Sequence, residues 1–232
     1  ENTNPFIIGI MNKAIFFKEW IKTRGLFFIT LLVSLCFAGY VMMRINRVIT
    51  FKGADHLWAI LLSRDTVFIE LLQYLPLIIG ALYASSQFIP EMTQKRLKLT
   101  LHLPAGETQI MASMLWYGFS VVLLLCLLLS LVLAAVVRLF LPSEVVGMML
   151  QQLLPWIVAA VAGYGFTAWV CIEPQWKQRM LCIVVSVGLL SMLFVSSYPG
   201  AYSQFGAGIG WILAASFIFP FSSCIRFKYG VQ

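Results

Sequence analysis

Long apolar runs separated by short polar stretches make up most of the chain, and residues 121–137 (VVLLLCLLLSLVLAAVV) are a clear example. A helix needs roughly 20 apolar residues to cross a hydrocarbon core about 30 Å thick. In lipid, a helix also satisfies its backbone hydrogen bonds within its own segment. A transmembrane barrel would instead show short segments of alternating character. The pattern therefore predicts an all-α, multi-pass membrane protein.

Six runs are long enough to be membrane-spanning helices. We place them at Leu26–Val41 (reaching toward Met43), Thr66–Pro90, within Ile110–Leu139, Val146–Ile172, Met180–Ser197 and Ala207–Phe221. The third run exceeds the length that one crossing needs, so this helix should tilt or project into water. The turn residues of SYPGAYSQFG, residues 197–206, separate the last two spans.

The composition supports this prediction. Of the 232 residues, 61% are hydrophobic and 11% are charged, whereas soluble domains carry about 25% charged residues. A soluble fold could not bury so much apolar surface. We therefore attribute the net charge of +7 to loops that set the orientation in the membrane, and we expect no nucleic-acid partner.

The distribution of lysine and arginine predicts that orientation. With six spans, both termini lie on the same side of the membrane as the loops after the second and fourth spans. Cytoplasmic loops are enriched in Lys and Arg, so this side is predicted to be cytoplasmic, in an inner or plasma membrane. It carries 11 of the 16 basic residues, namely Lys13, Lys18, Lys22, Arg24, Lys95, Arg96, Lys98, Lys177, Arg179, Arg226 and Lys228. The outside carries the other five, Arg44, Arg47, Lys52, Arg64 and Arg138, and residues 44–65 are predicted to form its largest loop.

A different kind of segment precedes the first span. On a helical wheel of residues 10–23, most apolar side chains fall on one broad side, and most polar ones, including Glu19, fall on the other. Basic amphipathic helices with Trp and Phe on the apolar side lie in the membrane interface. We therefore predict an amphipathic elbow helix within residues 1–25, ahead of a transmembrane domain at 26–232; an incidentally helical soluble tail is the alternative. The residues expected at the interface are Phe16, Phe17, Lys18, Trp20 and Lys22.

Residues that could support catalysis or bind a metal are sparse. The five cysteines form no C-x-x-C pair and are typical of small apolar residues in the spans. No G-x-x-x-x-G-K-[ST], H-E-x-x-H or G-x-S-x-G motif occurs. The two histidines, His56 and His102, are predicted on opposite sides of the membrane and cannot share a metal. We expect a chain that is not an enzyme and binds no cofactor or metal itself.

Glu70 is the one acid predicted within a span, in TVFIELLQYLP. Charged groups inside a membrane are costly and are candidates for a substrate path. Gln73, about one turn further on, would face a similar direction. Glu70 lies about one turn from the predicted outer end of its span, so an interfacial or helix-pairing role is the alternative.

One dense polar stretch, FIPEMTQKRLKLTLHLPAGETQ at residues 88–109, interrupts the apolar pattern between the second and third spans. Its basic residues could meet acidic residues on a partner, and its leucines could supply apolar anchors. The orientation rule also explains these charges. The alternate leucines of Leu97–Leu103 are typical of a strand as much as of a helix.

The order of these features resembles the membrane (permease) subunit of the type-2 family of ABC exporters. AIFFKEWIKTRGLFFITLL, residues 14–32, is similar to that family's N-terminal elbow running into the first span. Residues 88–110 are similar to its acidic residue at the cytoplasmic end of span two, followed by a basic stretch and an L-x-L-P ending. The matching residues are Glu91, Lys95, Arg96, Lys98, Leu101, Leu103 and Pro104. The short turn at 197–206 departs from the helical insertion that members often carry there.

The resemblance implies that residues 91–107 are a coupling segment docked on a separate cytoplasmic ABC ATPase subunit. That subunit would bind ATP and Mg²⁺, and two permease chains, identical or homologous, would form the path in membrane lipid. The residues expected at the ATPase contact are Glu91, Lys95, Arg96, Lys98, Leu99, His102 and Leu103.

Two other functions stay open from the sequence. A non-transporting membrane scaffold or assembly factor would use the same loop to hold a partner without a central path. An ATP-independent transporter would need more buried charge than Glu70 offers. The apolar spans favour a lipid, a hydrophobic peptide or a drug-like substrate over a sugar or an ion, on composition alone.

Overall fold

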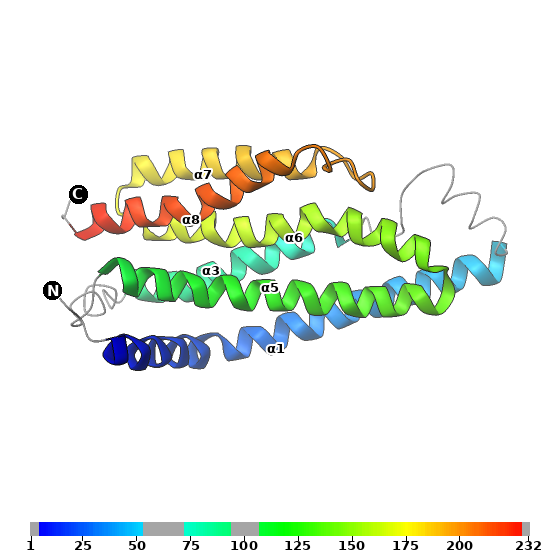
Figure 1. The fold of residues 1–232 in the computed structure, drawn as a ribbon, viewed down its shortest axis with the longest axis horizontal. Coiled ribbons are helices and arrows are strands. Elements are labelled where there is room, and N and C mark those ends of the chain that lie inside the picture. The colour runs from blue at the N-terminus through cyan, green and yellow to red at the C-terminus, as the bar shows by residue number, and fades with distance from the viewer. Residues whose placement is uncertain (1–4, 53–71, 94–106, 229–232) are drawn as a thin grey trace.

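The computed structural model describes residues 5–52, 72–93 and 107–228, and the side chains of 13–51, 72–93 and 108–227. The described residues form helices and no strands, which confirms the all-α prediction. Most of these helices run along the long axis of the molecule (Figure 1). They are α1 (Pro5–Lys52), α3 (Leu75–Thr93), α5 (Glu107–Phe140), α6 (Ser143–Ile172), α7 (Trp176–Ser191), the 3-10 helix η2 (Met192–Phe194) and α8 (Gly206–Lys228).

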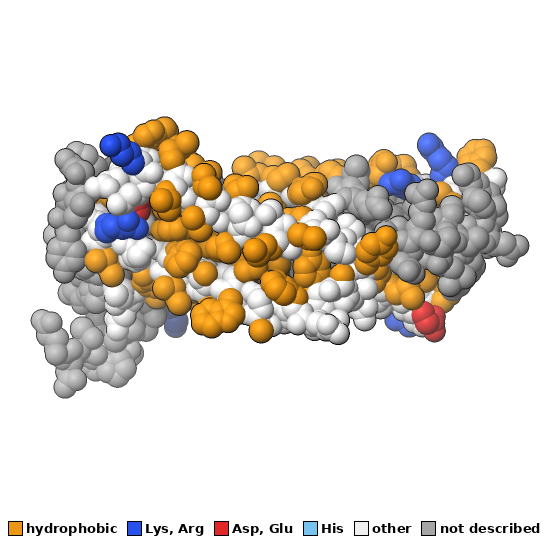
Figure 2. Space-filling model, turned by 90° about the horizontal axis from the view of Figure 1, so that it is seen from above, with side chains coloured by type: hydrophobic (Ala, Val, Ile, Leu, Met, Phe, Trp, Pro, Cys, Tyr) orange, Lys and Arg blue, Asp and Glu red, His pale blue; other side chains and the backbone are white. Residues whose placement is uncertain are grey.

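Five helices in the described part of the chain are long and apolar enough to cross a membrane: α1, α5, α6, α7 together with η2, and α8. Large apolar side chains such as Leu131, Val184 and Ile218 are more than 60% exposed on their surfaces. Apolar side chains line the middle of the face in Figure 2, and charged ones lie toward its two ends. A bilayer is the solvent that such a surface fits, so the helices have the character of a multi-pass membrane protein.

The second predicted span, Thr66–Pro90, is only partly described. α3 covers its later part, with Pro76 in the first turn, where a backbone N–H is not needed. Residues 66–71 lie outside the described residues. The count of six crossings and the cytoplasmic placement of the termini therefore stay predictions.

Helix α1 extends beyond its predicted bounds in both directions. It runs for 48 residues, through Gly25, where we predicted the elbow to end, and through Arg44 and Arg47, which we assigned to an outside loop. Residues 44–52 are therefore helical, and their position outside the membrane stays a prediction. No proline or cluster of turn residues interrupts this stretch, and extending an existing helix is far less costly than starting one.

Helix α6 lies at the centre of the bundle and packs on α3, α5, α7 and α8. Small residues set the distance to two of these neighbours. A Cβ atom on Gly80 of α3 would overlap the carbonyl oxygen of Ala160, and one on Gly165 would overlap that of Ser216 in α8. Glycine at such contacts lets helix backbones approach closely, so α3 and α8 pack directly on the α6 backbone.

The predicted turn before the last helix is confirmed. Residues 195–205 form bends and turns, and Gly200 adopts a left-handed backbone with φ of 76°, which favours glycine. The five cysteines are free.

Candidate functional site

Four charged side chains meet at the end of the molecule where α1 and α5 begin and α3 ends (Figure 1). We name this group, Lys18, Glu19 and Lys22 of α1 with Glu91 of α3, the Lys–Glu cluster. The three α1 residues lie within about one helical turn of each other. Glu91 is the first residue of the predicted coupling segment, residues 91–107. The cluster therefore joins the two stretches on which the family resemblance rests.

Lys22 is the centre of the cluster. Its Nζ donates to Glu91 Oε1 at 2.9 Å, to the backbone carbonyl of Gln87 at 2.9 Å and to Glu19 Oε2 at 3.1 Å. Lys18 Nζ lies 3.0 Å from Glu91 Oε1 and 3.9 Å from Glu19 Oε1. An ammonium group has three donors, and Lys22 uses them on two helices at once.

The two carboxylates are buried, whereas the lysines keep some access to solvent. The side chains of Glu19 and Glu91 are 0% and 1% exposed, against 19% for Lys22 and 39% for Lys18. Burial by itself would raise the pKa of Glu91, but hydrogen bonds from Lys22 and Lys18 and their positive charges outweigh it, so this pKa lies below its ordinary value. Glu91 is therefore ionised at neutral pH.

Uncharged side chains extend this cluster into the bundle. Gln87 Nε2 donates to the carbonyl of Met114 in α5 at 2.9 Å, and Tyr164 of α6 donates its hydroxyl to Gln87 Oε1 at 2.7 Å. The hydroxyls of Thr23 and Tyr117 lie 2.6 Å apart. Helices α1, α3, α5 and α6 are thus connected through buried hydrogen bonds that converge near Lys22.

The Tyr164 side chain can pack against α5 because the residue opposite it on that helix is Gly118. A Cβ atom on Gly118 would overlap the hydroxyl and ring of Tyr164, and Tyr164 is fully buried. Only glycine leaves room for the ring in this position.

A third buried carboxylate, Glu173, lies where α6 turns into α7. Its Oε2 accepts from Ser223 at 2.5 Å and lies 3.1 Å from the Arg226 guanidinium of α8. Its backbone carbonyl accepts from Arg179 Nη2 at 2.6 Å, and Arg226 also donates to Gln178. This group connects α6, α7 and α8 at a short turn, so we interpret it as structural.

The structure places the predicted site residues in three ways. Glu91, predicted on the ATPase contact, is buried against α1 and does not offer its carboxylate to a partner, because a buried charge needs nearby counter-charges. Gln73 lies half-buried in the turn before α3. Six other predicted residues of the contact, together with the possible substrate-path acid, lie outside the described residues: Lys95, Arg96, Lys98, Leu99, His102, Leu103 and Glu70.

The elbow residues divide between lipid and the bundle. Phe17 and Trp20 are exposed at 66% and 37%, and Phe16 packs edge-on against Tyr117 with ring centroids 5.5 Å apart. Lys18 and Lys22, predicted to face the interface, contact Glu91 instead. Lys18, Lys22 and Phe16 therefore contact the bundle, whereas Phe17 and Trp20 face outward.

The sequence analysis missed Glu19, Gln87, Tyr117 and Tyr164 as parts of the site. Glu19 was placed on the polar side of the wheel and was not assigned to a site. A signal was present, since a polar stripe on a helix in lipid is expected to face the protein interior. No such signal marked Gln87, whose partners come from other helices.

The described residues contain no group of three or more His, Cys, Asp or Glu side chains that could hold a metal. No known protein family, no curated protein and no solved structure matches the chain. The cluster geometry and the sequence pattern are therefore the basis for a functional proposal.

Proposed function

We propose that this chain is the permease subunit of a type-2 ABC exporter, with six membrane spans and cytoplasmic termini in an inner or plasma membrane. A separate ATPase subunit binds ATP and Mg²⁺ and docks on residues 91–107, and a second permease chain completes the substrate path. The resemblance at residues 14–32 and 88–110 supports this proposal, as do the five helices that fit a bilayer.

The observation that carries the proposal is the burial of Glu91 against α1. The coupling segment begins at this residue, and Glu91 is bonded to Lys18 and Lys22 while α3 leads from it into the membrane. Separating a buried carboxylate from its lysines is strongly unfavourable. A displacement of the segment would therefore be passed to α1 and α3 together, which is what a chain driven by an external ATPase requires.

The end of the molecule on which this contact would form is defined by several helices. The end of α3 and the start of α5, which flank residues 94–106, lie at the same end as the start of α1 and the end of α8 (Figure 1). A partner bound there would reach the segment and the predicted elbow at once. This arrangement supports one docking face.

The test is a double charge reversal in the segment, Arg96→Glu with Lys98→Glu. We expect loss of at least tenfold in the amount of co-purified ATPase and in the ATP hydrolysis of the complex in nanodiscs, since like charges across a contact are repulsive. The matched control is Arg47→Glu with Arg138→Glu, two exposed residues at the opposite end, which should leave both quantities unchanged. Unchanged assembly and hydrolysis in the first variant would overturn the proposal.

A further inference from the structure

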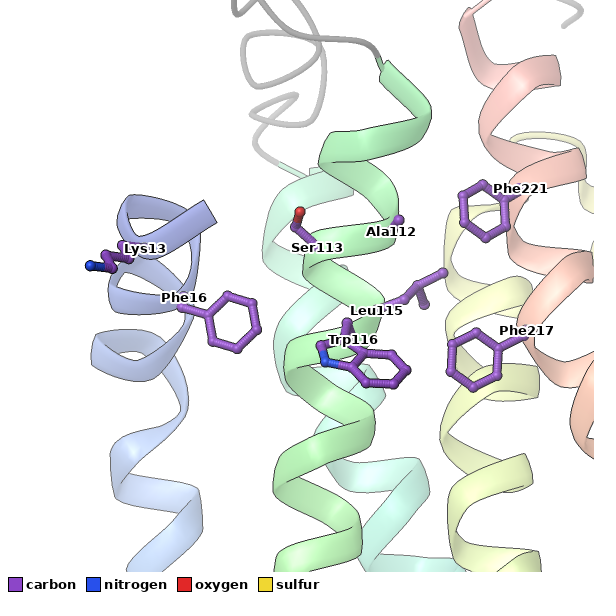
Figure 3. Close-up of a pocket in the computed structure, with 8 residues that line it drawn as sticks. All are labelled: Lys13, Phe16, Ala112, Ser113, Leu115, Trp116, Phe217 and Phe221. Carbon is purple, nitrogen blue, oxygen red and sulfur yellow. The ribbon is translucent and has the colours of Figure 1, made fainter. Parts of the chain in front are cut away.

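An apolar groove runs along α5 where α1, α6 and α8 approach it. Its first part is a cavity of about 650 Å³ lined by Lys13, Phe16, Ala112, Ser113, Leu115, Trp116, Phe217 and Phe221. In Figure 3, Phe16 of α1 points toward α5, and Trp116 and Leu115 of α5 point toward the two phenylalanines of α8. A second hollow of about 380 Å³ shares Trp116 and Phe217 and continues to Leu123 and Leu213. We name the two together the aromatic groove.

The aromatic groove has the length of a lipid tail in one leaflet. From Ala112 to Leu123 the α5 axis rises by about 17 Å at 1.5 Å per residue, and half of a hydrocarbon core is about 15 Å. Inside the groove the rings of Phe119 and Phe217 stack with centroids 3.7 Å apart, so part of its wall is a firm aromatic surface. Such a wall binds an apolar chain and offers nothing to an ion.

Among the residues that the structure describes, Lys13 is the one charged residue that lines the aromatic groove, and it lies at the rim. It is exposed, and in Figure 3 it lies on the α1 turn next to Phe16, with its ammonium directed away from α5. Its flexible stem must therefore turn for the ammonium to meet a phosphate at the rim. Among the described residues no carboxylate pairs with it. Lysine side chains extend from an apolar surface to place the charge at the headgroup level, where an anionic headgroup would meet it.

We propose that the aromatic groove binds one anionic phospholipid from the leaflet on the Lys13 side, with an acyl chain along Trp116 and Phe217 and the phosphate on Lys13. The charge of Lys13 selects this occupant over a zwitterionic lipid, because a basic residue near the surface favours anionic lipid by about 1 kcal/mol, or about fivefold. The site does not depend on the exporter function.

Fluorescence quenching tests this assignment. The protein is placed in phosphatidylcholine nanodiscs that contain increasing fractions of dibrominated phosphatidylglycerol or, in parallel, dibrominated phosphatidylcholine. The fluorescence of Trp116 is obtained by subtracting the emission of the Trp116→Phe variant from that of the wild type. We expect it to be half-quenched at an about fivefold lower fraction of the brominated phosphatidylglycerol, and we expect Lys13→Gln to remove that preference.

Two controls and three contrary outcomes complete the design. Lys177→Gln, which changes a charge outside the aromatic groove, should keep the preference, and the signal of Trp211, an exposed residue outside it, should show none.

Equal half-quenching fractions for both lipids would mean an unselective lipid shell. Absence of quenching by either lipid would mean that a second copy or another protein covers the groove. A preference that survives Lys13→Gln would remove Lys13 from the site. Each of these results would overturn the proposal.

Discussion

Helix α3 is held to two neighbours by different means. Along α6 it packs backbone to backbone, with Gly80 against the Ala160 carbonyl and Leu77 against Gly163. Toward α1 it uses charges, through Glu91, Lys18 and Lys22. The first contact depends on shape, and close-packed surfaces tolerate little change. The second depends on flexible lysine side chains that can follow a moving carboxylate.

This difference indicates which helices move together. A shift of α3 along α6 would bring backbone atoms into overlap, whereas a shift between α3 and α1 would only require new lysine rotamers. Under the proposed mechanism, α3 and α6 respond to the coupling segment as one rigid unit. Helix α1 follows them because Lys18 and Lys22 keep their bonds to Glu91 while their rotamers adjust. The following substitutions test the two contacts, from the largest expected effect to the smallest.

Lys22→Met should be the most destabilising of these changes. It leaves two buried carboxylates with Lys18 as their remaining partner in the cluster, and loss of one partner from a buried ion pair costs about 3–5 kcal/mol. Unfolding in mixed SDS micelles would measure the free energy. Lys22→Arg, which keeps the charge, should recover most of that loss; equal stability of Lys22→Met and the wild type would show that the cluster does not hold α1 to α3.

Gly80→Ala should disturb the α3–α6 contact by an intermediate amount. The added Cβ meets a backbone oxygen that cannot rotate away, and overpacking a tight interface costs about 1–3 kcal/mol. Gly210→Ala is the matched control, since a Cβ there has nothing within 4 Å, and alanine favours a helix by up to about 1 kcal/mol. If thermal unfolding in detergent shows the same change for both glycines, the contrast drawn above fails.

Lys18→Gln should have the smallest effect. Its side chain is 39% exposed, and partly exposed ion pairs contribute about 0–1 kcal/mol. The same SDS titration should therefore show a loss well below that of Lys22→Met. A loss as large as that of Lys22→Met would mean that the two lysines hold Glu91 equally, and that α1 and α3 are joined more rigidly than we infer.

The helical and membrane-spanning character could be predicted from the sequence because it depends on local patterns. Runs such as residues 121–137 and the turn at 197–206 are recognisable without neighbours. The extent of α1 was harder, since charged residues at 44 and 47 suggested a loop. Charges near a helix end can extend into the headgroup layer without ending the helix.

The site was harder to predict, because its members are assigned by tertiary packing. Lys22 and Glu91 were each chosen for a reason, but as parts of two different surfaces, and 69 positions separate them. Which side of α1 faces α3 depends on the packing of both helices in the bundle, which no local period encodes.

Two glycine patterns illustrate the same limit. Ala159-x-x-x-Gly163 and Gly206-x-x-x-Gly210 have the same spacing, and both permit close approach of helices. In the structure Gly163 faces Leu77 of α3, whereas among the described residues no packing neighbour lies within 4 Å of where a Cβ on Gly206 or Gly210 would be. The pattern alone does not say which of two motifs a neighbour will use.

Gly118 leaves room for the Tyr164 ring, so a mutation at position 118 would also affect the Lys–Glu cluster. Tyr164 orients the Gln87 side chain, and the backbone carbonyl of Gln87 accepts a hydrogen bond from Lys22. A methyl group added at position 118 of α5 would displace Tyr164 of α6. That displacement would pass through Gln87 of α3 to the ammonium of Lys22 in α1. Screens that consider only residues with reactive or charged groups would overlook a position whose contribution is the absence of a side chain.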